Sequence, residues 1–265
     1  MVVLLSCPAT DTAPIPDSAV AGGTVARHYL WRMNAAPVID VVIPAYNEEA
    51  SVAKVVRDLP RASLRRILVC DNASTDATAA EAERAGATVL YESRPGYGSA
   101  CLCGLEYIEA HPPHPDVVVF LDADYSDHPE ELPQLVAPIL TDQKDLVIGA
   151  RVADKREPGA MLPQQLFGNW LATRLIRWLY GHRYTDLGPF RAIRYDALQR
   201  LQMRDTNYGW TVEMQVKALQ HGLRIGEVPV SYRQREGISK ISGTVKGTIM
   251  AGYKIIKTIL VYARQ

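Results

Sequence analysis

Residues 117–124 read VVVFLDAD, and this stretch indicates the class of fold more directly than any other part of the sequence. Five apolar residues, three of them β-branched, run directly into the carboxylates Asp122 and Asp124. A strand that is apolar on both faces is typical of a parallel sheet buried between helices, whereas a strand with one solvated face alternates polar and apolar residues. The stretch therefore predicts a central strand with two acids at its carboxyl end.

Strand and helix patterns alternate on both sides of this stretch. Short apolar runs rich in β-branched residues predict four further strands, at 38–43, 65–70, 87–92 and 145–151. Helix patterns lie between them, at 48–59, 74–86 and 98–110, and another helix opens at His128-Pro129. The alternation favours an α/β fold with a mostly parallel central sheet flanked by helices, including a Rossmann-like nucleotide-binding half. Such sheets bind ligands at the carboxyl ends of their strands.

The composition argues against several classes of protein. The chain has 265 residues, 48% of them hydrophobic, and its 29 basic and 29 acidic residues cancel, which argues against nucleic acid as a partner. Four cysteines without metal-ligand spacing fit a reducing cytosol. The opening MVVLLSC lacks the basic start of a secretory signal, and no apolar run approaches the roughly 18 residues that span a bilayer. We therefore expect a cytoplasmic globular protein.

The chain divides into three parts. Residues 1–36 are rich in Ala, Pro, Thr and Gly without a sustained period, and we expect a poorly ordered extension there. Residues 37–242 carry the α/β domain, and residues 243–265 predict a basic amphipathic helix. The second half of the domain adds two helices and one strand, predicted at 163–180, 210–220 and 224–232.

Two segments mix basic and apolar residues in a way that suits a membrane surface. From Arg233 to Gln265 the chain holds seven Lys or Arg and one Glu, a net charge of +6. The helix predicted at 163–180 mixes Trp170 and Trp178 with arginines. Both patterns suit a helix that lies on the surface of an anionic membrane, so peripheral attachment at the inner face of the membrane is one expectation. Both equally suit a core-packed helix with a solvated basic edge.

Acidic residues gather at the predicted carboxyl ends of the strands. Asp122 and Asp124 are costly to hold together just past a buried strand unless a cation neutralises them. A divalent ion shared with a diphosphate would do so, and a solvated strand end is the alternative. Glu48 and Asp71 follow two other strands and point to the same crevice, although Glu48 can also stabilise a helix N-terminus and Asp71 a local turn.

Seven motifs, in this order along the chain, resemble those of family 2 glycosyltransferases of the GT-A fold. They are PAYNEE (44–49), CDNASTD (70–76), RPGYGSA (94–100), LDADYSDHPEEL (121–132), IGAR (148–151), TDLGPFRA (185–192) and REGISK (235–240). The chain is most similar to the synthases that make dolichyl- or polyprenyl-phosphate-linked mannose or glucose. The resemblance implies an inverting, metal-dependent transfer from a nucleoside-diphosphate sugar, with Mg²⁺ or Mn²⁺ as cofactor.

The resemblance also implies roles for individual residues. Those at the nucleotide sugar would be Pro44, Ala45, Tyr46, Glu48, Asp71, Arg94, Asp122, Ala123, Asp124 and Arg151. Asp122 and Asp124 would be the metal ligands, and Arg235 and Lys240 would hold phosphate groups. Asp186 and Glu213 would lie at the acceptor, with a solvated helix face as the other interpretation of Glu213.

Two positions depart from the pattern of the lipid-phosphate mannose synthases. These enzymes often have Gln two residues after the second Asp, where this chain has Ser126, so water or His128 would have to complete the metal site. Gln234 stands at the position of a family arginine, and we take Arg235 as its displaced counterpart. The donor is therefore expected to be a UDP- or GDP-sugar, without a decision between them.

The acceptor is open between two classes, of which we favour a polyprenyl phosphate. That phosphate is anionic at neutral pH, whereas a soluble hydroxyl compound or glycan needs a general base, for which Asp186 or Glu213 would serve. Asp186 can instead orient Arg191 and its loop. Two other functions compete: a haloacid-dehalogenase-like phosphatase, suggested by the acid pair after an apolar strand, and a non-catalytic nucleotide-binding module.

Overall fold

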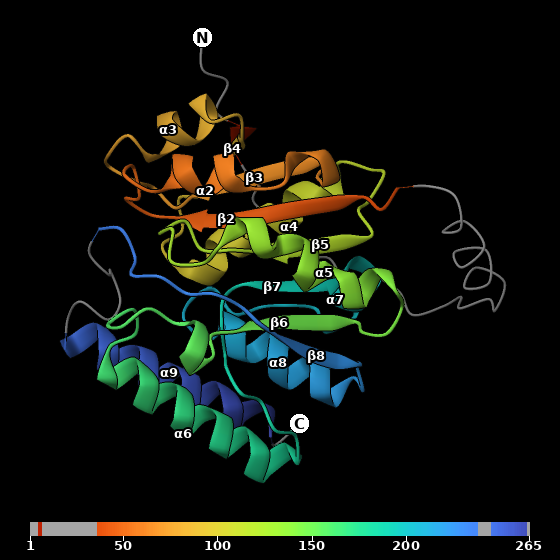
Figure 1. Ribbon diagram of the computed structural model, residues 1–265, viewed down its shortest axis with the longest axis vertical. Coiled ribbons are helices and arrows are strands. Elements are labelled where there is room, and N and C mark those ends of the chain that lie inside the picture. Colours follow the sequence, from red (N-terminus) through yellow and green to blue (C-terminus); the bar gives the residue numbers. More distant parts are fainter. Residues whose placement is uncertain (1–4, 7–35, 238–244, 264–265) are drawn as a thin grey trace, which may run out of the picture.

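The computed structural model describes residues 5–6, 36–237 and 245–263, which fold around one central sheet (Figure 1). The strands are β1 (Leu5–Ser6), β2 (Ile39–Ala45), β3 (Arg66–Asp71), β4 (Thr88–Tyr91), β5 (Val117–Phe120), β6 (Leu146–Ala150), β7 (Arg191–Arg194) and β8 (Ile225–Pro229). They lie in the order β1-β4-β3-β2-β5-β7-β6-β8. Neighbouring strands are parallel except that β7 runs antiparallel to both β5 and β6. The predicted α/β fold with a mostly parallel sheet is confirmed.

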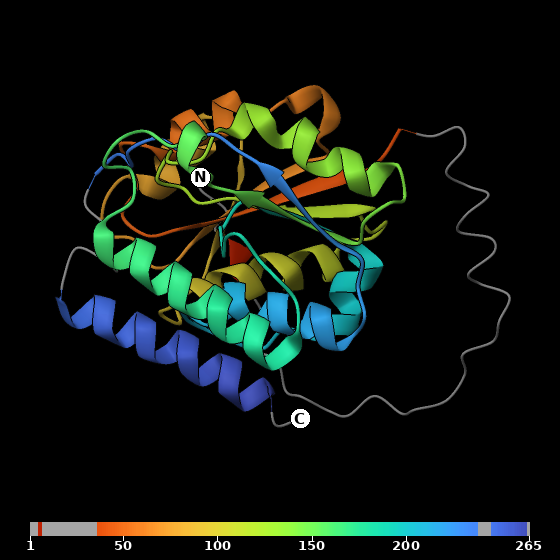
Figure 2. The same ribbon diagram turned by 60° about the horizontal axis from the view of Figure 1, so that its bottom comes forward.

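Helices cover both faces of the sheet, as Figure 2 shows. One face carries α2 (Val52–Asp58), α3 (Thr78–Arg84) and α5 (Leu132–Leu140). The other carries α4 (Tyr97–Ala110), α6 (Pro163–Tyr180), α7 (Tyr195–Leu201), α8 (Trp210–Gln220) and α9 (Val245–Tyr262). Short 3-10 helices lie at Arg61–Ser63, Pro129–Glu131 and Ala153–Lys155.

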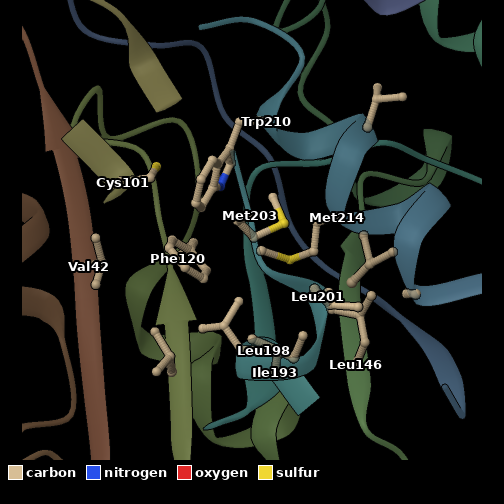
Figure 3. Packing of buried hydrophobic residues seen from close by; sticks show 14 of the residues in the cluster. Val42, Cys101, Phe120, Leu146, Ile193, Leu198, Leu201, Met203, Trp210 and Met214 are labelled. Atoms are coloured by element: carbon tan, nitrogen blue, oxygen red, sulfur yellow. The ribbon is translucent and has the colours of Figure 1, made fainter. Parts of the chain in front are cut away.

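The two layers of core explain why the central strands carry apolar residues on both faces. Along β2, Val42 faces the core formed with α4 and α8, whereas Val41 and Ile43 face the core formed with α2 and α5. Figure 3 shows the first of these cores, in which Trp210 of α8 meets Phe120 of β5 edge-on, with ring centroids 5.8 Å apart. The apolar residues of such a strand remove apolar surface from water on both faces.

Several element boundaries differ from those predicted. β5 ends at Phe120, so the acid pair lies in the loop that follows the strand. The helix predicted from residue 48 begins at Val52, whereas α6 and α8 have the predicted bounds. β7 has no counterpart in the predicted pattern because this four-residue strand begins and ends with buried arginines instead of apolar residues.

The predicted N-terminal extension is largely outside the described residues. Of residues 1–36, the structure describes Leu5–Ser6 and residue 36. Leu5–Ser6 forms the short strand β1, which pairs parallel to β4 at the edge of the sheet. The rest of the predicted extension, residues 1–4 and 7–35, lies outside the described residues.

α6 and α9 lie side by side at one end of the molecule (Figures 1 and 2). The Tyr180 hydroxyl on α6 donates to the carbonyl oxygen of Ile259 on α9 (3.0 Å). Lys254 of α9 forms an ion pair with Asp205 in the loop before α8 (2.8 Å), while Tyr253 is exposed. α9 therefore packs on the domain with one face and turns another outward. Across the described ranges, no helix has the length and apolarity required to cross a membrane.

Candidate active site

Two cavities open at the carboxyl ends of the central strands. The sheet-edge cavity, of about 530 Å³, is lined by eight of the residues predicted at the sugar nucleotide or its phosphates: Pro44, Ala45, Tyr46, Glu48, Asp122, Ala123, Asp124 and Arg235. The helix cavity, of about 510 Å³, is lined largely by residues of α6, α8, α9 and the loops beside them. The cavities share Asp122, Asp124 and Arg235, so they meet at the acid pair.

The wall of the sheet-edge cavity depends on two glycines of the RPGYGSA motif. A Cβ on Gly96 would lie 2.1 Å from the carbonyl oxygen of Thr206, and a Cβ on Gly98 would lie 1.9 Å from that of Asp205. Gly96 also has a φ of 137°, which side chains rarely allow. Glycine therefore lets the start of α4 approach the loop before α8, and Tyr97 lines the cavity between these two glycines.

The acid pair is held in place by neutral hydrogen-bond donors. The Tyr97 hydroxyl donates to Asp122 Oδ1 (2.9 Å), and the N–H and Oγ of Ser126 donate to Asp124 Oδ1 (3.0 and 2.5 Å). Burial, followed by the charge of Asp124, raises the pKa of Asp122 to about 7. Ionising Asp122 beside the charged Asp124 is therefore unfavourable, and a bound cation would stabilise the two negative charges.

The chemistry of the pair fits a hard divalent ion, because carboxylate oxygens are the ligands that Mg²⁺ and Mn²⁺ prefer. No group of three or more His, Cys, Asp or Glu side chains in the described part of the chain is arranged to hold a metal. Asp122 and Asp124 would thus supply two ligands. Ser126 is bonded to Asp124, His128 Nδ1 lies 2.9 Å from Glu130 Oε1, and neither Ser126 nor His128 lines a cavity.

Arg235 spans the junction of the two cavities. Its Nη1 lies 3.1 Å from Asp124 Oδ2, and its Nη2 donates to Glu48 Oε1 (2.6 Å). One guanidinium therefore connects an acid that follows β5 with an acid that follows β2. Lys240, predicted to hold phosphate groups together with Arg235, lies outside the described residues.

The helix cavity contains a second arginine, Arg151, which follows β6. Its backbone N–H, Nε and Nη2 donate to the carboxylate of Asp186 (3.0, 2.6 and 2.8 Å), and its guanidinium lies 5.0 Å from the ring centroid of Tyr232. Burial alone would raise the pKa of Asp186, but Arg151 outweighs burial and holds that pKa below its ordinary value. The structure thus holds Asp186 as an ionised partner of Arg151.

Asp186 lines neither cavity, and its placement bears on both of its predicted roles. A base would have to reach the acceptor, whereas this carboxylate is turned to Arg151. Arg191, which we expected Asp186 to orient, instead donates to the carbonyl oxygens of Thr211 (2.9 Å) and Gly188. The positioning interpretation of Asp186 fits the geometry, with Arg151 in place of Arg191.

Glu213 is fully buried on α8, so its interpretation as part of a solvated helix face is wrong. Its carboxylate accepts hydrogen bonds from the Asp205 N–H (2.7 Å) and the Tyr262 hydroxyl (2.7 Å) and pairs with Lys217 Nζ (2.7 Å). These contacts join α8, the loop before it and the end of α9. Since Glu213 lines neither cavity, its contacts are those of a structural residue.

Three residues predicted at the nucleotide sugar do not line the sheet-edge cavity: Asp71 and Arg94 line neither cavity, and Arg151 lines the helix cavity instead. Asn72, which follows Asp71, lines the sheet-edge cavity. Asp71 Oδ1 accepts a hydrogen bond from a backbone N–H three residues further on (3.2 Å), as in the local-turn alternative. Arg94 forms an ion pair with Glu92 (2.8 Å). Asn72 lines the cavity and braces it by donating to the Arg94 carbonyl (2.7 Å) and accepting from the Gly96 N–H (2.7 Å). Asn72 belongs to the motif CDNASTD, and this was the signal in the sequence that could have identified it as a site residue.

A mostly parallel sheet with an acid pair and an adjoining cavity at its carboxyl edge is the arrangement expected from the resemblance to GT-A glycosyltransferases, and comparison with known proteins leads to the same class. Residues 40–202 match the model of the family described as Glycosyl transferase family 2. The chain belongs to glycosyl transferase family 2 and is an enzyme of that family. The phosphatase alternative is therefore wrong, and so is the non-catalytic module.

Named relatives lie in the same family. The chain is 39% identical over 225 residues to an uncharacterized glycosyltransferase of Mycobacterium tuberculosis, covering 82% of this chain and 95% of that protein. It is 34% identical over 228 residues to an undecaprenyl-phosphate mannosyltransferase of Micrococcus luteus, covering 78% and 88%.

A solved structure has the same fold. The glucosyl-3-phosphoglycerate synthase of Mycobacterium tuberculosis, in a complex with Mn²⁺, UDP and glucosyl-3-phosphoglycerate, has a TM-score of 0.70 to this chain. The two are 23% identical, and the match covers 94% of this chain and 87% of that one. At this identity the likeness is one of fold.

Proposed function

We propose that the protein transfers a sugar from a UDP- or GDP-sugar to a polyprenyl phosphate, with inversion at the anomeric carbon and with Mg²⁺ or Mn²⁺ as cofactor. The observation that carries the proposal is the meeting of two cavities at Asp122, Asp124 and Arg235. The sheet-edge cavity takes the donor and the helix cavity takes the acceptor. The diphosphate and the acceptor phosphate then face each other at the junction.

Asp122 and Asp124 hold the metal in this proposal. When bound, the metal neutralises the charge that develops on the leaving diphosphate. Tyr97 and Ser126 fix the two carboxylates by the hydrogen bonds described above, so the ligands need little rearrangement. Arg235, beside the pair, offers a planar fork of donors to phosphate oxygens.

An acceptor phosphate explains why the helix cavity has no evident side-chain base. Apart from Asp122 and Asp124, its described lining contains no carboxylate and no histidine. An anionic phosphate oxygen attacks the anomeric carbon on the face opposite the leaving group. The bond from that carbon to the diphosphate oxygen breaks, and the nucleoside diphosphate leaves with the electron pair. No proton has to be removed, so neither Asp186 nor Glu213 is required as a base.

The lining of the helix cavity suits an amphipathic acceptor. Arg151 and Arg235 supply positive charge close to the acid pair, where the acceptor phosphate would lie. Further residues of the lining, among them Met161, Leu187 and Ile255, are apolar. A phosphate attached to an isoprenoid chain matches both parts of this lining, whereas an uncharged glycan has neither an anionic group for the arginines nor an apolar chain for the remaining residues.

A lipid acceptor implies contact with a membrane surface, for which α6 and α9 supply the outer face. Phe167, Trp170 and Trp178 of α6 are 61%, 51% and 79% exposed, and the Arg174 guanidinium lies 5.5 Å from a ring centroid of Trp170. Tyr253 of α9 is 61% exposed. Exposed aromatic rings beside basic groups suit the headgroup region of an anionic membrane. We therefore expect peripheral attachment through these two helices.

Transfer assays test the acceptor. The protein is incubated with Mn²⁺, a panel of UDP- and GDP-sugars, and either a short polyprenyl phosphate or soluble hydroxyl and glycan acceptors. We expect a glycosylated product with the polyprenyl phosphate and none with the hydroxyl acceptors. Transfer to the hydroxyl acceptors alone would overturn the proposal and restore the need for a base.

Liposome flotation tests the attachment. Wild-type protein should float with liposomes that contain anionic lipid and do so less in high salt, because exposed charges are screened. Trp170→Ser with Trp178→Ser should weaken flotation and leave transfer to a detergent-dispersed short polyprenyl phosphate intact. Tyr91→Ser removes an exposed aromatic residue from β4 and serves as the matched control. Equal flotation of both variants would contradict attachment through α6.

A further inference from the structure

The segment after β8 lies across the junction of the two cavities as a fixed strap, residues 231–236. The Arg233 N–H donates to the Ser126 carbonyl oxygen (2.9 Å), and the Glu236 N–H donates to the Asp124 carbonyl oxygen (2.9 Å). Its first residue, Ser231, is bonded through its N–H and Oγ to Glu131 (2.8 and 2.9 Å). The backbone of the strap is thus bonded to the segment that carries the acid pair.

The far end of the strap is also tied to α2. Lys54 of α2 forms an ion pair with Glu236 (2.6 Å). The Arg235 side chain, next to Glu236, therefore projects from a backbone that is held on both sides. Any change in its position is expected to come from side-chain rotation, since moving the strap would break several hydrogen bonds at once.

Arg235 lies between two carboxylates, those of Asp124 and Glu48. Its guanidinium contacts Asp124 and Glu48, as described above, and Asp124 is one of the two predicted metal ligands. The buried Nε of Arg235 has no hydrogen-bond acceptor among the described residues. A buried donor without an acceptor costs free energy, so this arrangement does not use all that the side chain can bind.

A guanidinium and a divalent ion compete for the same carboxylate. Arginine at 3.1 Å already compensates the charge of Asp124, so a metal gains less there than at a bare acid pair. A nucleoside diphosphate changes the balance because it brings phosphate oxygens, which a guanidinium binds well. With the donor present, Asp124 can bind the metal while Arg235 binds the diphosphate.

We propose that Arg235 is an exchangeable counter-ion: it occupies Asp124 while the donor is absent and turns to the diphosphate when metal and donor bind together. The inference rests on the proposed function, since it needs a metal and a nucleotide at this site. Its consequence is coupled binding, in which the metal binds weakly alone and tightly with the nucleotide. Arg235 then promotes ordered loading of the donor complex in addition to holding a phosphate.

Mn²⁺ binding, measured by the loss of the free-ion electron paramagnetic resonance signal, tests this exchange without turnover. Arg235→Met should bind Mn²⁺ at least threefold more tightly than wild type when no nucleotide is present. With saturating UDP or GDP, whichever the wild type binds, the same variant should bind Mn²⁺ at least threefold more weakly. Arg235→Lys, which keeps the charge, should lie nearer to wild type in both conditions.

Arg233→Met is the matched control, because Arg233 lies on the same strap but is placed over the Tyr125 ring, 3.7 Å from its centroid. Its Mn²⁺ affinity should stay within twofold of wild type, and thermal unfolding shows whether each variant is folded. If Arg235→Met changes the Mn²⁺ affinity in the same direction with and without nucleotide, or not at all, the exchange is refuted. If wild type binds no Mn²⁺ even with nucleotide, the proposed metal-dependent donor site fails and the exchange with it.

Discussion

The two cavities share three residues but are built in different ways. The sheet-edge cavity takes most of its lining from turns that directly follow β2, β3 and β5 and from the start of α4, and each of these turns has its own sequence motif. The helix cavity takes its lining from α6, α8, α9 and the strap, which are distant in sequence. In the proposed function, donor binding would therefore depend on local turns, whereas acceptor binding would depend on how the helices pack. Substitutions in the two cavities should separate these functions.

The largest effect is expected at the junction, where a change should disable both cavities. Asp124→Asn removes one carboxylate from the acid pair but keeps an oxygen that can accept from Ser126. We expect Mn²⁺-dependent binding of the nucleotide to be lost and turnover to fall by about a hundredfold or more, since a catalytic metal contributes several kcal/mol. Calorimetric titration and transfer assays measure these changes. Asp154→Asn, at an exposed position outside both cavities, is the control; nucleotide binding by wild type that persists in chelator would contradict the prediction.

Asp186→Asn should affect the acceptor side alone. The buried guanidinium of Arg151 loses its counter-charge, so we expect the free energy of unfolding to fall by about 3 kcal/mol. Acceptor use should weaken roughly tenfold through misplacement of Arg151, while the dissociation constant of the donor stays unchanged. Urea unfolding and steady-state kinetics measure both. If Asp186 were the general base, turnover would instead fall by about 10²–10⁴ and the acidic limb of the pH–rate profile would disappear.

The next effect is the pH dependence of metal binding at the junction that the two cavities share. The pKa of Asp122 is raised from 3.8 to about 7, so the folded, metal-free protein holds this proton more tightly than the unfolded chain does. Its contribution to the free energy of unfolding therefore declines as the pH rises from about 4 to about 7. Metal binding must displace the proton, so Mn²⁺ affinity should rise up to about tenfold per pH unit below 7 and level off above it.

Thermal shifts with Mn²⁺ and nucleotide at pH 5.5, 6.5 and 7.5 measure that effect. The shift should grow with pH in wild type. Asp186 should add no such trend, because its pKa is lowered and it stays ionised throughout this range. A thermal shift that is the same at all three pH values would mean that Asp122 is already ionised at the lowest.

The smallest effect is expected at two helical glycines of the helix cavity. A Cβ on Gly168 of α6 or on Gly252 of α9 would meet no atom within 4 Å, so helix packing does not require glycine at either position. Alanine favours a helix interior by up to about 1 kcal/mol over glycine, so Gly168→Ala should raise Tm by about 2–4 °C. Its methyl group narrows the cavity, so the acceptor KM should rise a few-fold while the donor KM does not change.

Gly222→Ala provides the contrast for that experiment. Gly222 lies outside both cavities and has a φ of 63°, which favours glycine, so its replacement should lower Tm and leave both KM values unchanged. An unchanged acceptor KM in Gly168→Ala would mean that the acceptor does not reach this part of the helix cavity.

Much of the fold could be predicted because its signals are local. The apolar run 117–121 marks a strand with two buried faces, and the period of residues 163–180 and 210–220 marks helices whose bounds the structure reproduces. The strand β7 could not be found in this way, because Arg191 is buried through hydrogen bonds to the carbonyl oxygens of Thr211 on α8 and of Gly188, and not by an apolar pattern. The sequence did not predict a role for Tyr97 either. Its motif is marked by the two glycines beside it, and the hydrogen bond from Tyr97 to Asp122 forms only in the folded chain.

Local patterns in the sequence predict the α/β architecture, the motifs that line the sheet-edge cavity and the position of the acid pair after a buried strand. The spacing of apolar residues, the glycines of turns and the ends of strands depend on residues that are close in sequence, so they can be recognised without the tertiary structure. The partners of other charged groups depend on the folded chain: Arg151 meets Asp186, Glu213 meets the Tyr262 hydroxyl, and Arg235 meets Glu48, 187 residues away. A local pattern reports that a charged residue is present, but its partner, and hence its chemistry, depends on where the folded chain brings an opposite charge.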